Sequence, residues 1–434
     1  MLKLFYINRS IAIIFINNFW NILKGPVSIY ILLRTLTPEQ QGLWYTFISL
    51  SALTVFAEMG FTNIITRFVS HEFAHLKFDN NVIIGEDKYL IRIISLIRYA
   101  IKFYFFVIPL AVIILIIIGF YFFKTISSDI FIAWVLYSIS SGINLFVSLL
   151  QSIYQGLNKV YEIQHNIFLG SIFTTLLTWF LLCIKLNIWA LVISNYVGLI
   201  FTLILLIIKS PKFWHQIYVT SIEHNISWFK EIVSLQLKYA ISWISGYLVF
   251  QLYIPLTYKY CGAVIAGKLG ITLTIVRIII SMSNAWISSE IPKLNILVSQ
   301  KKYIELKQNF NKAEVNGFLF YIISGLIFVF MVYFMKLYNF YFDRFVGLDI
   351  IILMLSYELC SLKISFMANY LRSFKKEPYY ILSFFNGVMI SFIIMISLLK
   401  SNLIILFILI NFLNWLVILP WALKIFYSFE EDIK

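Results

Sequence analysis

The chain has 434 residues, of which 61% are apolar and only 12% are charged, and it carries a net charge of +14. Soluble domains hold about 25% charged residues, so this composition excludes a soluble fold. Long uncharged runs recur along the chain, and a helix of about 20 such residues crosses the roughly 30 Å of bilayer hydrocarbon. The sequence therefore predicts an all-α polytopic membrane protein.

Twelve membrane-spanning helices are expected, joined mostly by short connections. The first of them lacks the cleavage site of a removable signal peptide, so we expect it to be retained. In chain order the expected spans are residues 11–33, 42–66, 103–123, 130–150, 165–184, 189–208, 239–258, 263–289, 314–335, 346–368, 379–399 and 402–423.

The basic residues are divided unequally between the two sides of this topology. Of the 34 Lys and Arg residues, 23 fall on the side of the N-terminus and seven on the other side. By the positive-inside rule the richer side is cytoplasmic, and so are both termini. Topology and attraction to the lipid bilayer account for the net charge, so no nucleic-acid partner is expected. The basic segment 300–314 is expected to form an amphipathic helix on the cytoplasmic surface.

A short polar segment, "LTPEQQGLWYTF" at residues 36–47, interrupts the apolar sequence. We expect it to form the turn between the first two spans, with Trp44 and Tyr45 at the outer membrane interface. A similar turn ends at Gly267, so that Gly42 and Gly267 correspond. The chain thus resembles two parallel copies of one six-helix unit.

This repeat predicts the domain organisation. Each half has six expected spans and a long basic loop after its second span. The predicted parts are an N-terminal six-helix half at 1–210, a cytoplasmic linker at 211–238 and a C-terminal six-helix half at 239–434.

Polar residues recur at helical spacing inside five of the expected spans. Steps of three and four residues place them on one face of each helix, where exposure to lipid would be costly. We expect these faces to line a water-filled cavity between the halves, where transporters of this architecture bind substrate. The five stripes are Asn17, Asn21, Lys24 and Ser28; Ser51, Thr54, Glu58 and Thr62; Ser141, Asn144 and Ser148; Thr274, Arg277, Ser281, Asn284 and Ser288; and Glu358, Ser361, Ser365 and Asn369.

The charged members of these stripes are the main candidates for a substrate site. Lys24 and Arg277 lie near the middle of their spans, and a point charge and a planar guanidinium suit a substrate with a pyrophosphate. Alternatively, Lys24 pairs with Glu58, and Arg277 with Glu358, as structural struts. Two further lysines lie closer to the ends of spans, where they either line the cavity or extend to the interface. They are Lys268 and Lys363.

Two stretches carry a resemblance to a known family: "LTPEQQGLWYTFISLSALTVFAEMGFTNIITRFVSHE" at 36–72 and "LLQSIYQGLNKVYEIQ" at 149–164. Both are similar to segments of bacterial O-antigen and polysaccharide flippases, whose superfamily also contains multidrug and toxin extruders. The resemblance implies MATE-like architecture and export of undecaprenyl-pyrophosphate-linked oligosaccharide across the bacterial inner membrane by alternating access. It also implies other polysaccharide assembly proteins as partners.

Other functions compete with this interpretation. A MATE-like multidrug or cation antiporter would favour acidic groups in its pocket, whereas a membrane polysaccharide polymerase would need catalytic groups on a large outer loop. No catalytic residue, metal site or cofactor is expected, because the three cysteines lie far apart and no P-loop occurs. A proton or sodium gradient coupled through Glu58 or Glu358 remains open.

Overall fold

The computed structural model describes residues 9–79, 81–123, 127–208, 210–220, 246–338, 342–374 and 378–431, together with scattered positions between 228 and 244. The chain divides into two compact units. The first unit contains residues 1–36 and 47–244, and the second contains residues 37–46 and 245–434.

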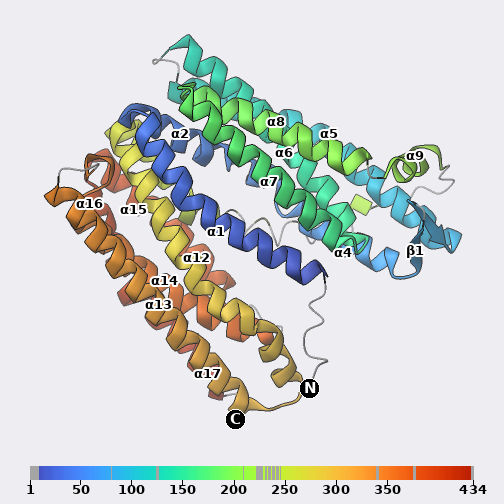
Figure 1. The fold of residues 1–434 in the computed structure, drawn as a ribbon. Coiled ribbons are helices and arrows are strands. Elements are labelled where there is room, and N and C mark those ends of the chain that lie inside the picture. The colour runs from blue at the N-terminus through green and yellow to red at the C-terminus, as the bar shows by residue number, and fades with distance from the viewer. Residues whose placement is uncertain are drawn as a thin grey trace. The chain divides into compact units, whose positions relative to one another are not determined.

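The first unit consists of long helices and one small hairpin. In Figure 1, α5, α6, α7 and α8 of this unit run side by side. Its elements are α1 (Arg9–Thr35), α2 (Pro38–Ser51, whose first turns belong to the second unit), α3 (Thr54–Glu58), α4 (Phe61–Phe73), β1 (Leu76–Asp79), β2 (Val82–Gly85), α5 (Asp87–Phe123), α6 (Ser128–Gly156), α7 (Val160–Cys183), α8 (Ile188–Ile208) and α9 (Pro211–Val219).

The second unit is helical throughout its described residues. α12 packs against α11, α13 and α14 (Figure 1). Its elements are α11 (Tyr253–Cys261), α12 (Ala263–Ser299), α13 (Tyr303–Leu337), the 3-10 turn η1 (Phe342–Arg344), α14 (Leu348–Ser373), α15 (Tyr380–Leu399), α16 (Leu403–Leu413), the π-helical turn η2 (Asn414–Ile418) and α17 (Leu419–Glu431).

The helices match the expected multi-pass architecture. Among the described residues, nine helices are long and apolar enough to cross a membrane, and the bent pair formed by α2–α3 and α4 makes a tenth. α1 is a further helix of 27 residues at the position of the first expected span. The seventh expected span, 239–258, lies partly outside the described residues.

The second expected span, 42–66, is broken, contrary to the continuous helix that its apolar composition predicts. Met59 and Gly60 have φ angles of 48° and 73°, in the left-handed region that no helix tolerates. α4 is consequently bent by 46° from the preceding helical segment. The predicted polar stripe of this span therefore does not continue as one helical face from Glu58 to Thr62.

The basic loop expected at 67–102 is largely ordered structure. β1 and β2 pair as an antiparallel hairpin with Leu76 opposite Gly85, and α5 begins at Asp87 rather than near residue 103. The Gln216 side chain of α9 donates to the carbonyl of Ile83 and accepts from its amide, both at 2.8 Å. A hydrogen bond from a side chain to a strand edge leaves no periodic pattern in the sequence. The polar composition of this segment therefore predicted a loop.

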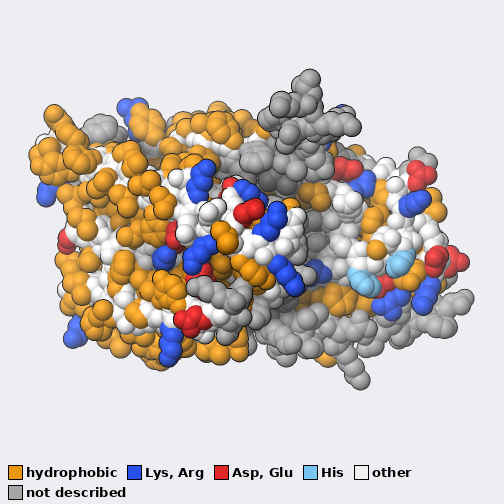
Figure 2. Space-filling model, turned by 90° about the horizontal axis from the view of Figure 1, so that it is seen from below, with side chains coloured by type: hydrophobic (Ala, Val, Ile, Leu, Met, Phe, Trp, Pro, Cys, Tyr) orange, Lys and Arg blue, Asp and Glu red, His pale blue; other side chains and the backbone are white. Residues whose placement is uncertain are grey.

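The basic segment 300–314 is helical, as expected, but it forms the start of α13. Three of its apolar residues, Leu306, Phe310 and Ala313, are buried, whereas Tyr303 and Ile304 are exposed. Phe310 packs against the rings of Tyr370 and Phe426 at 4.8 and 6.1 Å between centroids. On the polar side, Lys307 pairs with Glu430 at 2.9 Å. Figure 2 shows charged side chains gathered on this face of the second unit. The buried face therefore stabilises the fold, and Ile304 remains exposed at the start of α13.

The polar segment 36–47 contributes a tight helix contact inside the second unit. A Cβ added to Gly42 would lie 1.9 Å from the carbonyl oxygen of Ala263, and one added to Gly267 would lie 2.8 Å from the Gly42 nitrogen. The Gln41 amide donates to the Gly267 carbonyl at 2.8 Å. Tyr45 is 7% exposed because its ring lies against α12 at Gly270, and its position at the membrane interface stays a prediction.

Gly42→Ala is expected to destabilise the protein by about 1–3 kcal/mol, because the added methyl group overlaps the backbone of α12. Gly325→Ala is the matched control, since its Cβ would meet Leu355 at an ordinary 3.6 Å. The measurement is the unfolding temperature of the purified protein in detergent, followed by intrinsic fluorescence. Equal unfolding temperatures for the two variants would contradict the proposed close approach.

Candidate functional site

The polar stripe of α1 faces α7 within the first unit. Asn17 donates to the Gln164 side chain at 3.1 Å, and Lys24 Nζ donates to Ser171 Oγ at 2.8 Å. Asn21 is exposed. The expected cavity between the halves therefore stays a prediction, while most of this stripe has partners inside its own unit.

Lys24 does not form the strut with Glu58 that we considered. Among the described residues, no carboxylate lies within ion-pair distance of Lys24. Glu58, at the end of α3, instead accepts a hydrogen bond from Thr62 of α4. This bond spans the break at Met59 and Gly60, so Glu58 stabilises the bend between α3 and α4.

Lys24 lies at an open, polar pocket of about 310 Å³ lined by α1, α6, α7 and α8. Lys24 and the lining residues of α8 lie near the middle of their helices, away from the helix ends. None of the described residues that line it carries a carboxylate. Its polar lining residues are Lys24, Asn144, Gln151, Ser171, Thr174, Thr175, Asn195 and Thr202.

Two similar five-residue segments contact each other and line one side of this pocket. They are "GSIFT" at 170–174 in α7 and "GLIFT" at 198–202 in α8. A Cβ at Gly170 would lie 2.5 Å from Thr202 Oγ1, and one at Gly198 would lie 1.8 Å from Thr174 Oγ1. Each glycine therefore admits the threonine of the opposite helix, as small residues do in membrane helix pairs. Sequence reasoning missed this pair, although the repeated segment signals it.

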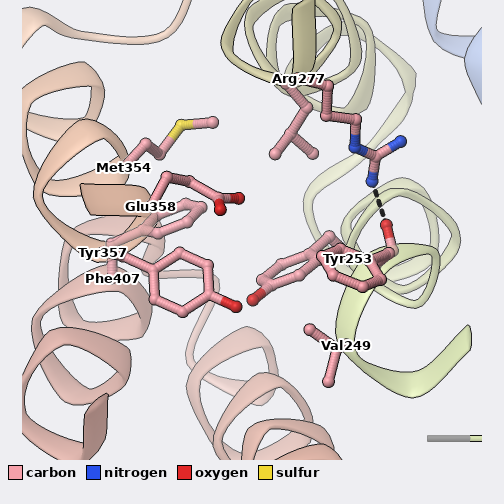
Figure 3. Close-up of a pocket in the computed structure, with 9 residues that line it drawn as sticks. Val249, Tyr253, Arg277, Met354, Tyr357, Glu358 and Phe407 are labelled. Carbon is pink, nitrogen blue, oxygen red and sulfur yellow. Dashed lines mark hydrogen bonds between the residues drawn. The ribbon is translucent and has the colours of Figure 1, made fainter. Parts of the chain in front are cut away.

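Arg277 lies in the second unit, at a small cavity between α11, α12 and α14 (Figure 3). The cavity has about 10 Å³, room for roughly one water molecule. The guanidinium donates to the carbonyl of Phe250, one residue before a turn that interrupts the helix at residues 251–252. Arg277 thus satisfies a carbonyl next to the interruption, where regular helical bonding ends.

Glu358 lines the same cavity and is 6% exposed. Its carboxylate extends into the space that separates it from Arg277 (Figure 3). Among the described residues, Arg277 and Glu358 form no ion pair within 4.0 Å, so the predicted structural pair is not formed. The hydroxyl groups of Tyr253 and Tyr357 point toward each other beside them (Figure 3). The arrangement places a cation and an anion in low dielectric with space for water between them.

The remaining predicted residues of the second unit are spread over several contacts. Asn284 accepts from Ser365 at 2.9 Å, which joins the stripes of α12 and α14. Lys363 pairs with Glu314 at 2.6 Å. Ser281 is exposed and Lys268 is half-buried. The structure thus brings Arg277 and Glu358 to one cavity. The other four predicted site residues lie outside its lining: Lys268, Ser281, Asn284 and Lys363.

No protein-family model and no curated protein matches the sequence. Solved structures do match over nearly the whole chain. An inward-facing multidrug resistance MATE family transporter of the MOP superfamily has a TM-score of 0.68, with 10% identity over 96% of both chains. An outward-facing one has a TM-score of 0.50, with 12% identity over 98% of this chain and 97% of that chain. MATE in complex with MaD3S has a TM-score of 0.51, with 11% identity over 98% of this chain and 94% of that chain.

At these identities the similarity establishes the fold. The chain is an all-α, multi-pass membrane protein with the architecture of MATE transporters, which confirms the predicted fold class.

Arg277→Met is expected to lower the free energy of unfolding by about 2 kcal/mol, because the Phe250 carbonyl loses its donor and Glu358 loses its neighbouring cation. Adding Glu358→Gln should restore part of this loss, since a neutral amide needs no cation. The four unfolding temperatures of the double-mutant cycle measure the coupling. Lys400→Met, an exposed change in the same unit, is the control. Strictly additive effects would show that Arg277 and Glu358 do not interact.

Proposed function

We propose that this protein is a flippase that moves undecaprenyl-pyrophosphate-linked oligosaccharide repeat units, precursors of O-antigen or a related surface polysaccharide. Movement is from the cytoplasmic to the periplasmic leaflet of the bacterial inner membrane, by alternating access and without chemical change of the substrate. The lipid-linked oligosaccharide, the bilayer and other polysaccharide assembly proteins are its partners.

The observation that carries this proposal is the Lys24 pocket. An ammonium group at mid-depth in a membrane is costly, and such groups mark substrate pathways. Here the ammonium is surrounded by hydroxyl and amide side chains with no carboxylate in the lining. That environment suits an anionic, hydroxyl-rich substrate and repels an organic cation. The MATE-like fold and the sequence resemblance at 36–72 and 149–164 support the same function.

The buried carboxylate of Glu358 favours a second candidate, a MATE-like multidrug or cation antiporter. A carboxylate beside a water-sized cavity can exchange a proton or bind a sodium ion during a transport cycle. Arg277 lines the same small cavity, however, and its positive charge would repel an organic cation (Figure 3). We therefore assign this carboxylate to coupling and not to substrate recognition. A polysaccharide polymerase is the least favoured alternative.

Deleting the gene in its native host tests the proposal. Complete single repeat units should accumulate on the cytoplasmic face of the inner membrane, with loss of surface polymer. Single units that reach the outer face without lengthening would indicate a polymerase. An unchanged pool of lipid-linked sugars together with raised drug sensitivity would favour the antiporter.

Lys24→Met should reduce surface polysaccharide at least about tenfold in the complemented deletion strain, because the pocket loses its one charge. Lys102→Met removes an exposed charge from α5 of the same unit and should leave the polysaccharide unchanged. Immunoblots of the membrane fraction check that both variants are present in equal amounts. Full polysaccharide in the Lys24→Met strain would remove Lys24 from the transport site.

A further inference from the structure

The lining of the Lys24 pocket distinguishes among anionic substrates. Of the described residues that line the pocket, Lys24 alone is charged. Ser171 Oγ accepts one ammonium N–H at 2.8 Å and also accepts from the Trp20 indole at 3.2 Å. An ammonium has three N–H donors, so two remain for a ligand. One half-buried cation with unused donors favours one anionic group.

The neutral lining residues carry acceptors as well as donors. Among the described residues, the side-chain amides of Asn144 and Gln151 form no hydrogen bond with another protein group, and Asn195 donates to Ser140 at 3.1 Å. An amide presents a carbonyl acceptor next to its donors. A ligand that satisfies this lining must therefore donate hydrogen bonds as well as accept them.

This requirement favours a sugar over a phosphate as the ligand of the pocket. The hydroxyl groups of a sugar donate and accept, whereas the oxygens of an ionised pyrophosphate only accept. A pyrophosphate would leave the amide carbonyls without donors, and its charges would exceed the single ammonium. A sugar carboxylate is a single charge that one compact ammonium can pair with.

The size and rigidity of the pocket agree with a small ligand group. Its volume of about 310 Å³ is near the lower end of the roughly 300–1,000 Å³ typical of small-molecule sites. It can hold only a small part of a repeat unit. The contacts of Gly170 with Thr202 and of Gly198 with Thr174 fix α7 and α8 at one spacing, so the lining is held in place before a ligand arrives.

We infer that this pocket is a subsite for one acidic sugar, a glycosyl residue with a single carboxylate, which pairs with Lys24 while its hydroxyl groups bond to the amides of α6 and α8. The inference rests on the proposed function, and it specifies the substrate class as repeat units that contain an acidic sugar.

Binding to the purified full-length protein in lipid nanodiscs tests this inference, with glucuronate, glucose and inorganic pyrophosphate as probes. Calorimetric titration should show glucuronate binding at least about tenfold more tightly than glucose and more tightly than pyrophosphate. Lys24→Met should abolish the preference for glucuronate over glucose, and Lys102→Met should keep it. Gln151→Leu should weaken the binding of glucuronate and of glucose by a similar factor, because it removes a neutral contact and leaves the charge of Lys24. The unfolding temperature of each variant checks that it is folded.

Three results would overturn the inference: no sugar binding by the wild-type protein, tighter binding of pyrophosphate, or an unchanged glucuronate preference in Lys24→Met. Its failure is distinguishable from failure of the proposed function. If the deletion strain traps lipid-linked units but glucuronate does not bind, the function stands and the subsite falls. If the lipid-linked pool is unchanged but glucuronate binding depends on Lys24, the subsite stands and the flippase falls.

Discussion

Within the hydrocarbon layer a polar group is costly unless a protein group or trapped water bonds to it. This constraint accounts for the unusual contacts of both units. Lys24 donates to Ser171, and Arg277 donates to a backbone carbonyl next to a helix interruption. Neither cation forms an ion pair with a carboxylate among the described residues. Each donates to a neutral oxygen, Ser171 Oγ for Lys24 and the Phe250 carbonyl for Arg277.

The helix interruptions follow from the same constraint. A broken helix exposes backbone groups that only side chains or trapped water can satisfy. At the first interruption, Thr54 donates to the Ser51 carbonyl at 2.9 Å, and Thr62 bonds to Glu58 across Met59 and Gly60. Charged and hydroxyl side chains therefore gather where the helices break. Discontinuous helices are also where many transporters place their binding sites.

The sequence predicted the positions of the polar groups better than their partners. Helical spacing placed Asn17 and Lys24 on one face of α1, and that face is indeed occupied by hydrogen bonds. The partner on α7 could not be predicted, because it depends on which helix packs against α1. Charge pairing favoured Glu58, which instead bonds locally to Thr62. The spacing rule holds within a helix, whereas partner choice is decided by packing.

Other features were present in the sequence but carried no periodic signal. The break at Met59 depends on a left-handed residue within an apolar run, and hydropathy does not report backbone angles. The repeated "GSIFT" and "GLIFT" were visible, yet only the structure shows that each glycine faces the other segment's threonine. The difference matters for function, because this contact fixes the walls of the Lys24 pocket. In the second unit, Arg277 donates to the Phe250 carbonyl and faces Glu358 across a water-sized cavity, and Glu358 is the coupling group in the proposed function. Lys24 keeps unused donors beside neutral amides, so in the proposed function it would be the group that selects an anionic sugar.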